Sequence, residues 1–233
     1  MKNRILLLLL LIGFTGNLWS QSEALMRKYT NNFDIFTDIW TDVPEGMEIK
    51  AINLGYNISS SYIIPIEGTH FGVLLGLGIT GHNLYSNSVQ VDVTDASGKR
   101  TGEVKFVRLD SIMPEVSYSR NKIALTYAEV PFEVRYYHEK SGVKVSTGIR
   151  IGFLLDSHSK YRGDDYLLGS EDVIRFKKKD LHNVSEYRFT PFVRVGWKWV
   201  NVTASYGLTG LYEQNKGPQM HPISLGLSFT PFH

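Results

Sequence analysis

Apolar and polar residues alternate with a period of two along several long segments of this chain. In residues 70–86, every second position from Phe71 to Ile79 is apolar, and glycine occupies most positions between them. Residues 143–160 alternate in the same way, with an apolar face opposite one that carries Lys144, Arg150 and Asp156. A period of two places successive side chains on opposite sides of a β-sheet. The pattern therefore predicts strands with one apolar and one polar face.

Breaker residues divide the chain into eight segments of this kind. We expect strands at residues 33–41, 48–66, 70–86, 122–138, 143–160, 186–198, 200–212 and 221–232. Short turns follow the second, fourth and sixth segments, whereas the other connections are longer. This asymmetry is typical of outer-membrane barrels, whose even strand number returns the chain to the periplasmic side. The predicted fold is all-β: an eight-stranded antiparallel up-and-down transmembrane β-barrel located in the cell outer membrane.

The long connection at residues 87–121 contains a hairpin pattern of its own. Val89, Val91 and Val93 alternate with polar residues, and a turn follows at residues 95–98. Two additional membrane strands here would place the charged stretch 161–185 on the periplasmic side and make the strand count odd. We therefore expect the hairpin to extend above the membrane.

The fourth segment is less regular than the others. Val130, Phe132, Val134 and Tyr136 share a face, but the apolar residues at 123, 125 and 127 fall on the opposite one. An extra residue in a strand shifts the phase of the alternation. A bulge near Ala128 would bring all of these apolar residues onto one face.

The first 20 residues have the order of a secretory signal. Lys2 and Arg4 precede the unbroken apolar run from Ile5 to Ile12, and small polar residues follow near Ser20. The run is too short for a membrane helix, which needs about 20 residues. We expect cleavage after Ser20, a barrel domain over residues 21–233, and no soluble domain after Phe232. The chain has no Cys, which excludes a lipoprotein anchor and disulfides.

The charge balance argues against a nucleic-acid partner. The chain has 25 Lys and Arg and 23 Asp and Glu, and removal of Lys2 and Arg4 with the signal makes the numbers equal. A nucleic-acid binder is expected to carry a basic excess.

Charged residues also occupy the polar faces of three predicted strands. They are Glu129, Glu133, Arg135, Arg150, Arg188, Arg194 and Lys198. Side chains just fill the interior of an eight-stranded barrel, and buried charges need partners. We interpret this set as a salt-bridged network in the lumen, in preference to a proton path or a buried catalytic carboxylate. The small barrel also argues against a wide diffusion pore, since open aqueous channels belong to much larger barrels.

No cofactor, metal or catalytic motif is recognisable. Residues 76–81 match G-x-G-x-x-G, but no helix follows to bind a pyrophosphate, so the glycines are expected to make room inside the barrel. The histidines lack metal-ligand spacing, and no local Ser, His and Asp set occurs. A basic run at residues 177–179, together with Arg175, is read as a solvated loop that could contact anionic lipopolysaccharide.

The signal, the eight segments and the aromatic-ended final strand Ser224–Phe232 resemble the outer-membrane β-barrel domain family common in Bacteroidetes, which includes PorT-like proteins. The stretches 36–40, 76–78 and 82–85 are also similar to members of this group. PorT-like members are associated with protein secretion across the outer membrane. The resemblance implies contact with outer-membrane lipid, recognition of the C-terminal strand by the barrel-assembly machinery, and an envelope or secretion protein as a partner.

The expected function is that of a non-enzymatic barrel acting through its extracellular loops in envelope integrity, adhesion or secretion-linked assembly. Two alternatives remain open from the sequence. A lipid-modifying enzyme would show a close His–Ser or His–carboxylate pair at the rim. A soluble periplasmic barrel that binds an apolar ligand would turn its apolar faces inward.

Overall fold

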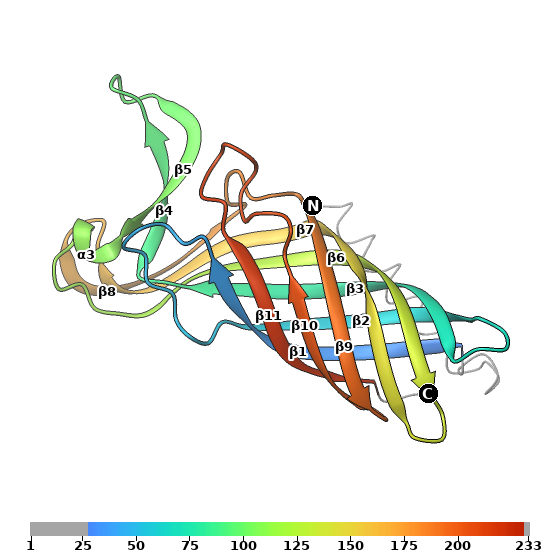
Figure 1. The fold of residues 1–233 in the computed structure, drawn as a ribbon. Coiled ribbons are helices and arrows are strands. Elements are labelled where there is room, and N and C mark those ends of the chain that lie inside the picture. The colour runs from blue at the N-terminus through green and yellow to red at the C-terminus, as the bar shows by residue number, and fades with distance from the viewer. Residues whose placement is uncertain (1–27, 231–233) are drawn as a thin grey trace, which may run out of the picture.

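Eight antiparallel strands close into a barrel in a computed structural model that describes residues 28–230 (Figure 1). The strands, in ring order, are β1 (Tyr29–Thr41), β2 (Leu54–Pro65), β3 (Phe71–Tyr85), β6 (Tyr118–His138), β7 (Val143–Asp165), β9 (Tyr187–Trp197), β10 (Val200–Tyr206) and β11 (His221–Phe229). The last strand pairs with the first, with Phe229 opposite Phe33, so the ring has no open edge. The predicted eight-stranded barrel is confirmed. The signal predicted at residues 1–20 lies outside the described residues.

Four further elements lie at the end of the barrel opposite the short turns (Figure 1). Strands β4 (Ser88–Thr94) and β5 (Arg100–Arg108) form a separate two-stranded sheet, followed by the short helix α3 (Leu109–Ile112). The predicted hairpin beyond the barrel is therefore confirmed. Strand β8 (Ser170–Lys179), which the sequence pattern did not predict, pairs with β7 from His158 to Asp165. We call this end the loop end and the other the turn end.

Apolar side chains cover the outside of the barrel and polar ones fill the inside. Leu75 of β3 and its partner Phe132 of β6 are 52% and 47% exposed, whereas the adjacent Glu133 is only 2% exposed. A closed barrel satisfies its backbone hydrogen bonds between strands, and an apolar exterior suits lipid. This orientation is wrong for a soluble barrel with an apolar interior, so that alternative is overturned. Within residues 28–230, no helix has the length and hydropathy needed to cross a membrane.

The irregular phase of β6 has a different cause from the predicted bulge near Ala128. The register of β6 against β3 is continuous, so Ile123, Leu125 and Tyr127 point inward like Glu129. The bulge lies in β7: Thr126 pairs with Asp156 and Tyr127 with Leu154, which leaves Leu155 unpaired. Inward positions of β7 are even-numbered before the bulge and odd-numbered after it.

Two strands are shorter at the loop end than the pattern predicts. β2 begins at Leu54. The preceding Asn53 holds the chain in a turn, because its side-chain Nδ2 donates to the carbonyl oxygens of Asp38 (3.1 Å) and Lys50 (2.7 Å). β10 ends at Tyr206, and the following residues fold across the barrel mouth, where Ser185 N donates to Leu211 O (3.1 Å).

Candidate functional site

A chain of ion pairs crosses the barrel interior between four strands. Asp34 of β1 accepts hydrogen bonds from Arg150 of β7 (3.1 Å) and Arg194 of β9 (3.2 Å). Arg194 also donates to Glu133 of β6 (3.1 Å), which pairs with Arg135 of the same strand (2.8 Å). All five side chains are at most 6% exposed.

Ring contacts add to this network. The guanidinium groups of Arg150 and Arg194 lie 4.5 Å and 5.3 Å from the ring centre of Phe192. Cation–π contacts strengthen when water is excluded, and buried charges are tolerated only with such partners. The arrangement fills the lumen and joins strands that are distant around the ring.

The structure places six of the seven predicted lumen residues inside the barrel. Glu129 accepts from Asn57 Nδ2 (3.1 Å) and from the Thr80 hydroxyl, so it is held apart from the ion-pair chain. Arg188 lies over the ring of Tyr127, 5.6 Å from its centre. Lys198 was predicted wrongly, because it is exposed in the β9–β10 turn with a positive φ of 51° and its Nζ lies over the Trp197 ring.

Sequence reasoning missed two buried acids of the lumen, one of which, Asp34, belongs to this network. Asp34 and Asp38 are almost fully buried, yet neither was assigned to the lumen. The signal was present, since both lie opposite Phe33, Ile35 and Ile39 in the alternation of the first strand. Lys144, 2% exposed, was also missed on the polar face of β7.

An apolar cluster closes the loop end of the lumen above the charges. Inward side chains from the barrel strands meet side chains from the loops. The cluster contains Trp40, Met47, Leu84, Val104, Ile123, Leu125, Tyr127, Leu181, Val184, Leu211, Tyr212 and Met220. Burial raises the pKa of Tyr212, which stays neutral. We call this group the apolar plug; with the charge network it closes the lumen at two levels.

Three His–carboxylate pairs occur in residues 28–230, and none has the order of a catalytic triad. One joins the exposed His182 to Asp92 between loop residues, with Nδ1 3.3 Å from Oδ1. His82 Nδ1 lies 2.7 Å from Asp38 Oδ2, while the Ser224 hydroxyl donates to Asp38 Oδ1 (2.6 Å). The carboxylate thus stands between serine and histidine, whereas a triad needs histidine in the middle.

The third pair lies nearer the rim. His158 Nδ1 is 2.5 Å from Asp156 Oδ2, but its Nε2 is buried without a hydrogen-bond partner. A general base must reach the proton that it removes. Nε2 therefore lacks both a nucleophile and access to one in this arrangement.

Within the described part of the chain, the residues are not arranged as a metal centre or a dinucleotide site. No group of three or more His, Asp or Glu in residues 28–230 is arranged to hold a metal. The G-x-G-x-x-G stretch lies within β3, and a Cβ on Gly76 would come within 2.3 Å of Ser60 O and Ser61 Oγ. These glycines permit close packing against β2.

One comparison with known protein families agrees with this architecture. A family model described as "Outer membrane protein beta-barrel domain" matches residues 10–213. No curated protein matches the chain in sequence. Among solved structures, similarity is found to Ail, the attachment invasion locus protein of Yersinia pestis, solved in complex with the heparin analogue sucrose octasulfate. That similarity has a TM-score of 0.38 at 11% identity, over 87% of this chain and 97% of Ail.

The family match covers most of the chain, including the barrel strands from β1 to β10. Barrels of the outer membrane have short turns on the periplasmic side and longer loops outside the cell, so the turn end lies in the periplasm and the loop end outside the cell. The chain belongs to the outer membrane protein β-barrel domain family and resides in the outer membrane.

Proposed function

We propose that this protein is a non-enzymatic outer-membrane barrel that acts through its extracellular loops, in envelope integrity, adhesion or secretion-linked assembly. The observation that carries the proposal is the contrast between a closed lumen and a loop end with folded structure of its own. The ion pairs and the apolar plug fill the interior, whereas β4, β5 and β8 extend beyond the barrel.

The proposal includes a PorT-like role in a Bacteroidetes envelope. Its partners would be outer-membrane lipid, an envelope or secretion protein at the loops, and the barrel-assembly machinery acting on the C-terminal strand. β11 supports the last point, because it pairs with both β1 and β10 and completes the ring.

Removal of the β4–β5 hairpin tests the role of the loops. Ser88 pairs directly with Arg108, so a two-residue Asn-Gly turn can replace residues 89–107 without straining the barrel. We expect this variant to run faster than its boiled form on a gel, as the wild type should. Cells that carry it should lose detergent resistance, surface adhesion or secretion of a reporter protein.

A matched control replaces the periplasmic turn 139–142 with Asn-Gly and should leave the cells unchanged. Cells with the hairpin variant that keep all three properties would contradict action through this loop. The enzyme alternative is tested separately with His158→Ala and with His182→Ala, because the His158–Asp156 and His182–Asp92 pairs are the loop-end arrangements that would favour it. We expect the lipid profile of the outer membrane to stay the same by mass spectrometry; loss of a modified lipid would overturn the non-enzymatic assignment.

A further inference from the structure

Basic residues form two rows across the extracellular extension of the barrel wall. Arg120 of β6 pairs with Arg162 of β7, which pairs with Arg175 of β8. The second row is Lys122, Lys160 and Lys177, two residues nearer the membrane on each strand. Like charges directly opposite one another destabilise a sheet. Repulsion within the two rows therefore lowers the stability of the isolated protein, and an anionic ligand would relieve it.

Five of these side chains line one open groove of about 350 Å³ and have no acidic partner. We call Arg120, Lys160, Arg162, Arg175 and Lys177 the cation array. No ion pair joins a member of the array to a carboxylate anywhere in residues 28–230. Lys122 is already engaged, since its Nζ donates to Asn83 Oδ1 (2.7 Å).

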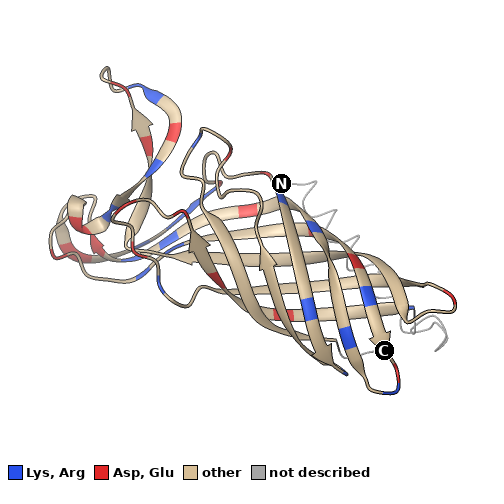
Figure 2. Cartoon of the chain, viewed as in Figure 1, with Lys and Arg blue, Asp and Glu red and all other residues tan. Residues whose placement is uncertain are grey.

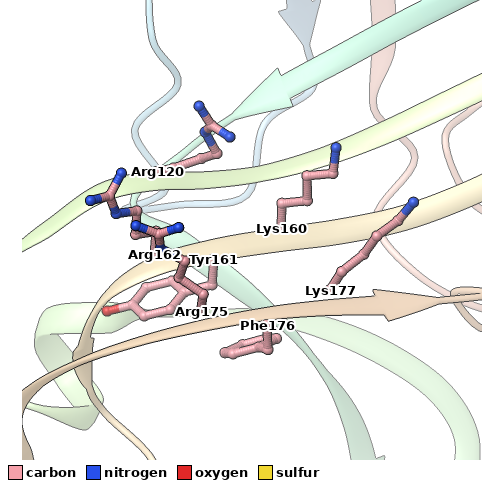
Figure 3. A pocket seen from close by; sticks show the side chains of 7 residues that line it. All are labelled: Arg120, Lys160, Tyr161, Arg162, Arg175, Phe176 and Lys177. Atoms are coloured by element: carbon pink, nitrogen blue, oxygen red, sulfur yellow. The ribbon is translucent and has the colours of Figure 1, made fainter.

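The opposite face of the same sheet holds the array in place. Figure 3 shows the five cationic side chains on one side of the strands and Tyr161 and Phe176 on the other. The two rings stack with centres 5.5 Å apart, and Tyr161 OH donates to Asp164 O (2.8 Å). Tyr161 is only 3% exposed, so β8 is packed firmly against its neighbours.

The array lies beside the membrane surface and faces outward. On β6, Arg120 has the same parity as the lipid-facing Phe132, with no bulge in β6 between them. The exposed apolar side chains on the outside of the barrel form a belt, and on β7 this belt ends at Leu155. Lys160 lies five residues beyond Leu155. At about 3.3 Å per residue and a tilt of about 40°, its backbone stands roughly 13 Å above that belt.

Acidic and basic residues lie at different heights along the extracellular extension of the barrel wall. This separation favours a ligand in the membrane. Exposed acidic residues, among them Asp110, Glu115, Glu171 and Asp172, lie at the far tip around α3 and the start of β8. Figure 2 shows this red tip and the blue segments closer to the barrel. A soluble polyanion approaching from outside would meet the acidic tip first, whereas lipid headgroups meet only the cations.

We infer that the cation array binds the phosphorylated sugar headgroups of lipopolysaccharide in the surrounding outer leaflet. Arginine suits this ligand, because its planar guanidinium binds phosphate oxygens in a bidentate manner. The inference deepens the proposed action of the loops by assigning a lipid to one of them, and it rests on the outer-membrane location.

The test measures binding of lipopolysaccharide with phosphorylated lipid A to the full chain folded in uncharged detergent. Each cation near an anionic membrane surface contributes about fivefold, so combining Arg120→Gln, Arg162→Gln and Arg175→Gln should weaken binding roughly 100-fold. The control variant Lys99→Gln, Lys105→Gln and Lys140→Gln removes equal charge elsewhere and should keep wild-type affinity. If the first variant lacks a fast-running folded band, Lys160→Gln with Lys177→Gln replaces it, with an expected loss of roughly 25-fold.

Three results would overturn the inference. They are unchanged affinity of the array variant, equal binding of dephosphorylated lipopolysaccharide by the wild type, and equally tight binding of the soluble polyanion inositol hexakisphosphate. Because this assay uses purified protein, its failure is distinguishable from failure of the cellular test with the hairpin variant.

Discussion

Asp34 of β1 and Arg194 of β9 meet inside the barrel at 3.2 Å, although 160 residues separate them in the chain. Arg150 shares the same carboxylate oxygen, so one acid partners two buried cations. Removal of one partner from a buried pair leaves an uncompensated charge.

The variant Asp34→Asn should therefore lower the free energy of unfolding by about 3–5 kcal/mol. The exposed Asp42, which has a positive φ that asparagine tolerates, provides the control Asp42→Asn with an expected change within about 0.5 kcal/mol. Urea unfolding in lipid vesicles, followed by tryptophan fluorescence, measures both. Equal stability of the two variants would show that the network is not needed.

An outward position in the apolar belt should not accept a charge. Leu75 is 52% exposed on β3, opposite Phe132. The variant Leu75→Arg should lose about 2–4 kcal/mol in vesicles, the range for arginine on the lipid face near the midplane. Ile112 of α3 is 40% exposed outside the barrel, so Ile112→Arg should change stability by less than about 0.5 kcal/mol. A reversed order would contradict the placement of the membrane.

The apolar plug should hold the loops to the barrel. Leu84 of β3 is 1% exposed within it, and truncation of a buried leucine to alanine costs about 2–5 kcal/mol. We expect Leu84→Ala to lower stability by this amount and to speed proteolysis after Lys216 in the β10–β11 loop. Leu168 is 84% exposed, and Leu168→Ala should do neither. Unchanged proteolysis in Leu84→Ala would indicate that the loops close the lumen by other contacts.

The bulge at Leu155 should be dispensable for the fold of β7. Its flanking residues already pair with consecutive residues of β6, so deletion of Leu155 closes the ladder and leaves Ser157 and Tyr161 facing the interior. We expect a fast-running folded band for this variant. Deletion of the paired Ile149 is the contrast, because it shifts the alternation by one residue and turns part of β7 inside out, and it should abolish the folded band. Loss of the folded band on deletion of Leu155 would mean that the extra residue is needed to close the barrel.

The packing of β8 predicts a response to alkaline pH. Burial, followed by the nearby Asp164, raises the pKa of Tyr161 to about 12 from its usual value of 10. Its stabilising contribution is complete below pH 10 and is lost as the pH rises through about 12. The difference in phenolate absorbance between the wild type and Tyr161→Phe should therefore have its midpoint near pH 12. A midpoint at 10 would show that the ring is open to solvent.

The alternating pattern was sufficient to predict the barrel, since a lipid-facing strand must be apolar at every second residue. It was less informative where side chains face the interior, because both charged and apolar residues are accommodated there. Ile123, Leu125 and Tyr127 broke the apparent phase of β6 because they belong to the plug, and no bulge exists there.

The partners within the lumen depend on the closed ring. Asp34 and Arg194 come together only after β11 pairs with β1, and no local spacing reveals that pairing. β8 escaped prediction for a related reason: its exposed positions are mostly charged, and only Ile174 and Phe176 mark its partly buried side. Lys198 matched the inward phase but fell beyond the last paired residue of β9.

The unpaired Leu155 divides β7 into two parts, one that faces lipid and one that faces water. Below it, the strand follows the rule of a membrane protein, apolar outside and polar inside; above it, the inner face gathers aromatic rings and the outer face carries charge, as in a water-soluble sheet. A change of phase confined to one residue makes the two halves modular. Exchanging everything beyond Leu155 for another sheet would give the same barrel a different surface without altering its fit to the lipid.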